Sequence, residues 1–169
     1  MDWIRLNLED NPAQKHKANQ MKSAIQKFWW LPILVLIVAS AGFVIWSLTP
    51  LGPMPEAREA LQSNAQVQVE SGDWWLFRPT RIQPVGGAII YPGGRVDPRS
   101  YAPEAQALAE QGYLAVIVPM PLNLAVFAPQ KASQVIAAYP EIRDWAIGGH
   151  SLGGAMAANF VHANPSQVK

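Results

Sequence analysis

A serine placed between two glycines is the feature of this sequence that points most directly to chemistry. Ser151 lies in the stretch "WAIGGHSLGGAMAA", with Gly149 two residues before it and Gly153 two residues after it. The apolar run "WAIGG" predicts a buried strand before the serine, and "LGGAMAANF" predicts a helix after it. A serine in a tight turn between a strand and a helix is the setting of a nucleophile elbow. We therefore predict that Ser151 is a nucleophile that attacks a carbonyl carbon.

The flanking glycines have a steric reason in such a turn. The residues two before and two after the serine nearly touch, so Gly149 and Gly153 leave the room that side chains would take. The first N–H groups of the following helix and the positive end of its dipole would stabilise an oxyanion formed nearby. The spacing of serine and glycines arises by chance in roughly one chain in twenty of this length. A glycine-rich turn without chemistry therefore stays an alternative.

The elements that must position Ser151 alternate between strand and helix from residue 64 onward. A hairpin is predicted first, from the alternating pattern "AQVQVE" at 65–70 and "WWLFRP" at 74–79. Short apolar strands then alternate with helical patterns, an order that implies a parallel sheet with right-handed crossovers. The predicted strands are 87–91, 113–119 and 145–149, and the predicted helices are 97–112, 128–140 and 152–164.

A long apolar segment precedes this folded part. Residues 28–48, "FWWLPILVLIVASAGFVIWSL", contain no charged side chain. At ~1.5 Å per residue, a helix of this length would be about 31 Å long, which matches the hydrocarbon core of a bilayer. Lysines precede the segment and acidic residues dominate after it, which predicts a cytoplasmic N-terminus and an extracytoplasmic remainder. We therefore expect a single transmembrane helix over 28–48 and contact with the lipid bilayer through it.

A cleaved signal is the alternative to a transmembrane helix in this N-terminal region. The "ASA" at 39–41 resembles a signal-peptidase site, so residues 1–41 would then be a cleaved signal. Both interpretations export the rest of the chain. Residues 1–27 are predicted to be a polar cytoplasmic tail, and 49–63, which are rich in proline, a linker to a partial domain at 64–169.

Composition narrows the classes of partner and cofactor. The 169 residues carry a net charge of +1, which provides no long-range field for nucleic acid. The chain contains no cysteine, which excludes disulfides and thiolate metal sites. We expect no cofactor and no metal, and the composition points to no particular protein partner.

Residues 86–165 together resemble a known superfamily. The runs "IIYPGGRVDPRSYAPEAQALAEQGYLAVIVPMPLNLAVF" and "IGGHSLGGAMAANFVHANP" resemble the α/β-hydrolase superfamily, closest to its small dienelactone-hydrolase-like branch, here with a membrane-anchored pattern. The resemblance implies the α/β-hydrolase fold, a three-layer domain with a mostly parallel sheet, of which this chain would hold the N-terminal half. It implies a serine hydrolase that acts on an ester or related carbonyl compound.

The resemblance also assigns roles to individual residues. Ser151 would be the nucleophile, and the backbone N–H of Leu152 would be one donor of the oxyanion hole. The N–H of Gly94, in the loop after "IIY", would be the other donor, with Arg95 as an alternative for that role.

The triad acid and base that such an enzyme requires match none of the candidates His150, His162, Asp97 and Asp144. His150 precedes the serine directly and is expected to face the opposite way, since neighbours in a strand point to opposite sides. His162 lies about 16 Å farther along the predicted helix. Asp97 is predicted to be a helix cap, and Asp144 lies at the far end of its strand. The chain is therefore interpreted as a truncated hydrolase that is nearly inactive alone.

Two further hypotheses concern the cleft at the carboxyl end of the strands. The segment 120–129, "MPLNLAVFAP", follows the carboxyl end of a strand, where its apolar side chains would line an acyl pocket or would only pack the loop on the sheet. A non-catalytic, exported binding module with the same cleft is the alternative function.

Overall fold

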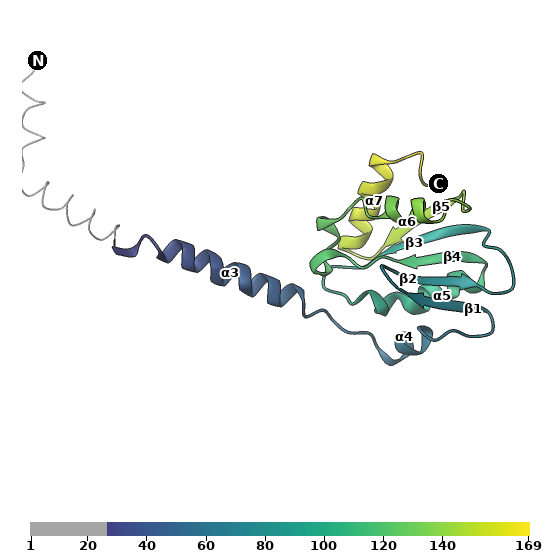
Figure 1. Cartoon of the computed structure of the whole chain (residues 1–169), viewed down its shortest axis with the longest axis horizontal. Coiled ribbons are helices and arrows are strands. Elements are labelled where there is room, and N and C mark those ends of the chain that lie inside the picture. Colours follow the sequence, from purple (N-terminus) through teal and green to yellow (C-terminus); the bar gives the residue numbers. More distant parts are fainter. Residues whose placement is uncertain (1–26) are drawn as a thin grey trace, which may run out of the picture. The chain divides into compact units, whose positions relative to one another are not determined.

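The computed structural model describes residues 27–169 and divides the chain into two compact units that meet between Phe43 and Val44. The predicted cytoplasmic tail at 1–27 lies almost entirely outside the described residues. The second unit holds the whole sheet and all the residues predicted to take part in chemistry (Figure 1).

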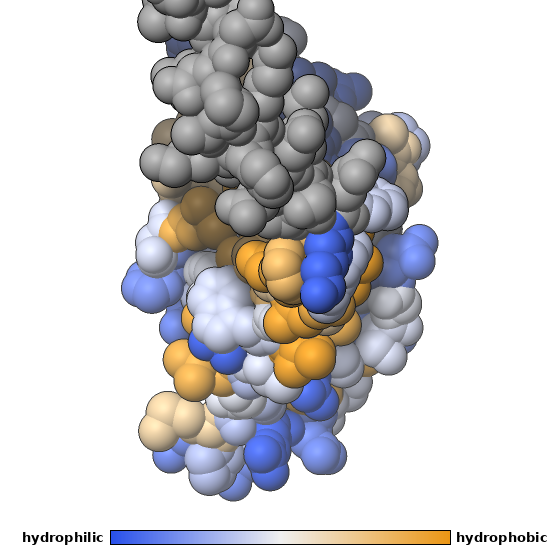
Figure 2. Space-filling view, turned by 90° about the vertical axis from the view of Figure 1, so that its left-hand side faces the viewer, coloured by the Kyte–Doolittle hydropathy of each residue, from blue (hydrophilic) through white to orange (hydrophobic). Residues whose placement is uncertain are grey.

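The helix α3 covers Leu31–Ser47 and is shorter than the predicted span at 28–48. A turn at Trp29 and Trp30 precedes it, and Pro32 occupies its second position, where a missing N–H is tolerated. The large side chains of α3 are apolar and exposed. In the space-filling view of Figure 2, hydrophobic residues form a cluster on the side that faces the viewer. None of the helices within 27–169 has both the length and the apolar character needed to cross a membrane. The predicted transmembrane helix is thus not supported.

Five strands form one mixed sheet in the order β1-β2-β4-β3-β5. The strands are β1 (Val67–Ser71), β2 (Trp75–Pro79), β3 (Gly86–Tyr91), β4 (Tyr113–Ile117) and β5 (Trp145–Gly149). The first two make the predicted antiparallel hairpin, and β2 also pairs antiparallel with β4. The strands β4, β3 and β5 run parallel, so their carboxyl ends meet at one edge of the sheet.

Helices cover both faces of this sheet, as the alternation of apolar side chains requires. On one face, Val116 and its neighbours pack against α6 (Ala132–Ala138) and α7 (Leu152–Ala163). On the other face, Ala115 and its neighbours pack against α5 (Ala102–Glu110). Three layers result, which confirms the predicted α/β class. The observed helices are shorter than the predicted ones, because proline and 3-10 turns limit their ends.

The segment at 49–63, predicted to be a proline-rich linker, packs against the rest of the second unit. It contains α4 (Pro55–Ala60), whose Ala57 and Ala60 are buried next to α5. Leu51 forms an isolated β-bridge with Val96. The small alanine side chains give α4 a face that packs closely, so this segment is part of the folded unit.

Short 3-10 helices follow the carboxyl ends of β3 and β4. The first, η1 (Pro98–Tyr101), begins at Asp97, whose carboxylate accepts a hydrogen bond from the Arg99 N–H at 2.9 Å. The Arg99 side chain also bonds this carboxylate, and that contact lowers the pKa of Asp97 below its usual value. Asp97 is therefore a helix cap, as predicted. The other two, η2 (Pro121–Asn123) and η3 (Ala125–Phe127), lie in the loop after β4.

Tyr91, the last residue of β3, ties the sheet to the start of α6. Its side chain is fully buried, and its hydroxyl accepts a hydrogen bond from the Ala132 N–H at 2.7 Å and donates one to the Pro129 carbonyl at 3.0 Å. Burial raises the pKa of this hydroxyl to about 12. The phenol is therefore held in its neutral form.

We expect Tyr91→Phe to lower the free energy of unfolding by about 1–3 kcal/mol, because the buried Ala132 N–H and Pro129 carbonyl lose their partner. Tyr113→Phe is the matched control, since Tyr113 is partly exposed and its hydroxyl makes no hydrogen bond within residues 27–169. Urea denaturation of both variants measures the difference. Equal stability of the two would contradict the assigned role.

The raised pKa also predicts a dependence on alkaline pH. The unfolded phenol loses its proton near pH 10, whereas the folded phenol keeps it until about pH 12. The contribution of Tyr91 to stability is therefore complete below pH 10 and falls as the pH rises toward 12. Between these values, the wild-type protein should lose more stability than Tyr91→Phe.

Candidate active site

The candidate nucleophile lies in the turn between β5 and α7. Ser151 has φ 51° and ψ −121°, a backbone conformation that non-glycine residues rarely adopt. Such a conformation costs of order 1–3 kcal/mol and persists only where the surrounding structure imposes it. The serine is exposed, and its hydroxyl makes no hydrogen bond to another described residue. The turn thus presents this hydroxyl to solvent at the carboxyl edge of the parallel strands.

The elbow requires glycine because three backbone segments meet there. A Cβ added at Gly149 would lie 2.7 Å from the carbonyl carbon of Gly153, and one at Gly153 would overlap the carbonyl oxygens of Tyr91 and Pro92. The turn therefore packs directly on the end of β3. The predicted contact between the two glycines is present, and the contact with β3 adds a second constraint that the sequence pattern does not show.

The residues that carry the two predicted oxyanion donors are in contact. A Cβ at Gly94 would be 3.4 Å from the Leu152 side chain, so the loop after β3 and the first turn of α7 are in contact. Neither the Gly94 N–H nor the Leu152 N–H donates a hydrogen bond within the described part of the chain. Both remain available to a ligand.

Arg95 does not supply the alternative donor that the sequence left open. Its backbone N–H donates to the Asn123 carbonyl at 2.9 Å and is therefore already used. The neighbouring Gly93 N–H is used as well, since it donates to the Tyr101 hydroxyl at 2.9 Å. Of these three successive N–H groups, only that of Gly94 is open.

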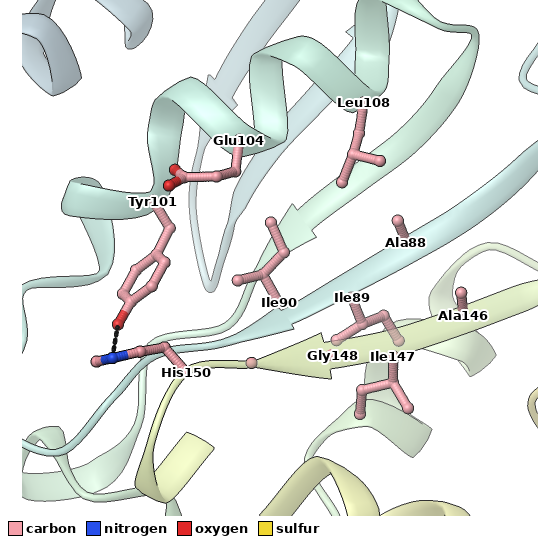
Figure 3. A pocket seen from close by; sticks show the side chains of 11 residues that line it. Ala88, Ile89, Ile90, Tyr101, Glu104, Leu108, Ala146, Ile147, Gly148 and His150 are labelled. Atoms are coloured by element: carbon pink, nitrogen blue, oxygen red, sulfur yellow. Dashed lines mark hydrogen bonds between the residues drawn. The ribbon is translucent and has the colours of Figure 1, made fainter. Parts of the chain in front are cut away.

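The structure brings neither histidine into position as a base. His150 points to the α5 side of the sheet, where its Nδ1 lies 3.4 Å from the Tyr101 hydroxyl (Figure 3). His162 lies in the last turn of α7, far along the helix from Ser151. The direction of His150 follows from the alternation of side chains at the end of β5.

The two aspartates considered as the triad acid are also occupied elsewhere. Asp97 caps η1 and pairs with Arg99. Asp144 precedes β5, at the end of the strand opposite to the elbow, and pairs with Lys169. These two aspartates and the two histidines therefore provide neither the acid nor the base for Ser151.

A groove of about 470 Å³ lies on the α5 face of the sheet. Figure 3 shows Tyr101, Glu104 and Leu108 of the helical segment above it and Ala88 and Ile90 of β3 on its floor. The lining extends through β5 to His150 but does not include Ser151. This groove is therefore not the pocket of the candidate nucleophile.

The loop after β4 lies beside the candidate donors, as its place after a parallel strand predicts. Leu124 is half-buried, and its side chain would be 3.4 Å from a Cβ at Gly94. Val126 and Phe127 are about half exposed, at 50% and 52%. Leu124 is thus the member of the predicted acyl pocket that the structure brings to the donors.

Residues 27–169 contain no cluster of three or more histidine or acidic side chains that would hold a metal ion. Tyr101 and Asn123, which no sequence pattern singled out, contact the loop of Gly94 through its neighbours. No motif marks these two residues. Their roles depend on side chains and carbonyls that are distant in sequence.

The sequence at 87–169 matches the model of the alpha/beta hydrolase family. This segment begins in β3 and includes Gly94, Ser151 and the whole of α7. The match supports the α/β-hydrolase superfamily for this part of the chain. No curated protein matches the sequence.

Among solved structures, an esterase of Pyrobaculum calidifontis is 18% identical, with a TM-score of 0.49; the match covers 78% of this chain and 50% of that one. A thermostable esterase from Pseudomonas putida ECU1011 is 19% identical, with a TM-score of 0.43 and coverages of 65% and 43%. The chain thus spans half or less of the length of these structures.

We expect Gly153→Ala to destabilise the protein, because the new methyl group overlaps two backbone carbonyls that cannot move independently of β3. An overpacked site of this kind costs about 1–3 kcal/mol or more. Gly148→Ala is the control, since a Cβ at Gly148 meets nothing within 4 Å. Denaturant midpoints compare the two variants. If Gly153→Ala were as stable as Gly148→Ala, the close packing of the elbow would be wrong.

Proposed function

We propose that this chain carries the nucleophile and the oxyanion hole of a serine hydrolase that acts on an ester or a related small carbonyl compound. The observation that carries the proposal is the strained Ser151 beside two unused N–H groups, those of Leu152 and Gly94. The family match over 87–169 supports the same class of enzyme.

The reaction would proceed through an acyl-enzyme. The Ser151 hydroxyl would attack the carbonyl carbon and lose its proton to a base, while the carbonyl oxygen takes the negative charge. The Leu152 and Gly94 N–H groups would stabilise that charge. Collapse of the intermediate would expel the alcohol, which receives the proton, and water would then release the acid. Leu124 would contact the apolar part of the acyl group.

The base in this proposal must come from outside the described residues. Without it, the serine hydroxyl is a poor nucleophile at neutral pH, and only binding and oxyanion stabilisation remain. We therefore propose that the 169 residues alone have little activity. The intact mass of the native protein tests this point, because a mass above 18.5 kDa would mean that further residues are available to complete the triad.

A binding module without catalysis is the second candidate. The observation in its favour is that His150, His162, Asp97 and Asp144 all lie in other contacts or far from the serine. A variant of the first proposal keeps the acyl-enzyme and transfers the acyl group to an acceptor other than water. Both alternatives use the same oxyanion hole.

A fluorophosphonate probe distinguishes the enzyme from the binding module. We expect the native protein to be labelled covalently at Ser151 and Ser151→Ala to lose the label, because the probe requires an activated serine hydroxyl. Ser100→Ala, which removes a serine hydroxyl from η1, is the control and should be labelled like the wild type. An unlabelled native protein would favour the binding module. Labelling that persists in Ser151→Ala would show that another residue reacts.

We also propose, from the sequence alone, that the folded unit is exported and that the apolar segment at 28–48 directs this export. The lysines before this segment and the acidic residues after it support that orientation. Protease treatment of intact cells should cleave the second unit without prior lysis. Protection of this unit in intact cells would contradict export, and a native N-terminus near residue 42 would indicate a cleaved signal.

A further inference from the structure

The carboxyl end of α3 is capped by Thr49, which follows it, and by residues that are distant in sequence. The last four carbonyls of a helix have no partner within the helix. In α3, the Thr49 hydroxyl reaches the Ile45 and Trp46 carbonyls at 3.2 and 3.0 Å. The Ser47 carbonyl accepts from the Asn123 amide at 2.9 Å. All of these residues belong to the second unit.

Arg95 makes the main contact with this helix end. Its Nε donates to the Trp46 carbonyl at 2.8 Å, and its Nη2 donates to the Thr49 carbonyl at 2.7 Å. The guanidinium also lies 4.5 Å from the centroid of the Trp46 ring, within the range of a cation–π contact. A positive charge at the negative end of the helix dipole is favourable.

The backbone of Arg95 belongs to the loop of the candidate oxyanion hole. Arg95 follows Gly94 directly, and its own φ is 58°. Its N–H donates to the Asn123 carbonyl, and its carbonyl accepts from the Leu51 N–H at 2.8 Å. These two bonds hold the peptide groups on both sides of the Arg95 Cα, directly after Gly94.

The strained residues of the second unit gather in this region. Arg95, Leu122 and Asn123 have positive φ, as Ser151 does, and all four lie in turns that follow parallel strands. A strained backbone conformation persists only where contacts with the surrounding structure hold it in place. Arg95 and Asn123 make such contacts with the end of α3, so the helix end and the two loops form one connected network.

We propose that Arg95 is a positioning residue that fixes the loop of the Gly94 N–H by clamping it to the carboxyl end of α3. It acts through the loop and does not touch the substrate. The inference rests on the proposed function only where it concerns the oxyanion hole. The clamp itself consists of the hydrogen bonds between Arg95 and α3 and does not depend on that function.

Arg95→Gly in the full chain separates the clamp from the backbone conformation. Glycine adopts a positive φ without strain, so this variant accommodates the shape of the loop while losing the Arg95 side chain with its guanidinium; the backbone freedom that glycine adds is controlled for by Arg95→Lys. Peptides that cover 92–96 should then exchange their amide hydrogens at least about tenfold faster, because exchange follows local opening. Labelling of Ser151 by the fluorophosphonate probe should slow about ten- to a hundredfold, less than the loss of a whole oxyanion donor.

Two further variants complete the design. Arg95→Lys keeps the positive charge but loses the fork of the guanidinium, so its exchange and labelling rates should lie between those of the wild type and Arg95→Gly. This variant also carries the test if Arg95→Gly does not fold. Arg81→Ala removes an exposed arginine from the loop after β2 and should match the wild type in both rates.

Each outcome decides between the alternatives. Unchanged exchange at 92–96 in Arg95→Gly would overturn the clamp. Faster exchange with unchanged labelling would show that Arg95 is structural and would overturn its positioning role. If the wild-type protein is not labelled at all, the proposed hydrolase function fails, and the exchange rates alone decide whether the clamp exists.

Discussion

The close approach of the β5–α7 turn to the end of β3 is the constraint on which the rest of the structure depends. The elbow lies so near the Tyr91 and Pro92 carbonyls that Gly149 and Gly153 cannot carry side chains. This packing imposes the rare conformation of Ser151 and leaves its hydroxyl exposed. It also determines where the first N–H groups of α7 point. The chemistry of the site is therefore a consequence of how tightly two parallel strands end side by side.

The loops after β3 and β4 extend this arrangement. Parallel strands end at one edge of the sheet, so the loops that carry Gly94 and Asn123 meet there together with the elbow. Each loop contains residues of positive φ, and each makes contacts that compensate for that strain. The contacts reach the end of α3 through Arg95 and Asn123. A segment that the sequence presents as a separate apolar helix is thus connected, at its carboxyl end, to the candidate site.

The opposite face of the elbow has a different character. His150 lies directly beside the candidate nucleophile in sequence, yet it faces the groove on the α5 side and the Tyr101 hydroxyl. The two sides of β5 therefore separate an apolar groove from the candidate oxyanion donors. In the described residues this separation leaves the serine without a base, which is why the proposed activity requires groups that these elements do not supply.

The sequence by itself determined the order of the strands and helices, the elbow and its glycines, and the cap at Asp97. These features depend on local patterns, namely alternating apolar residues, tight turns and side chains that bond the nearby backbone. It did not determine the packing of α4 or the use of the Arg95 N–H by the Asn123 carbonyl. Only the tertiary structure decided these, because each depends on a partner far away in the chain. Tyr101 and Asn123 carry no motif, so their contacts with the candidate site appear only when the loops are brought together in space.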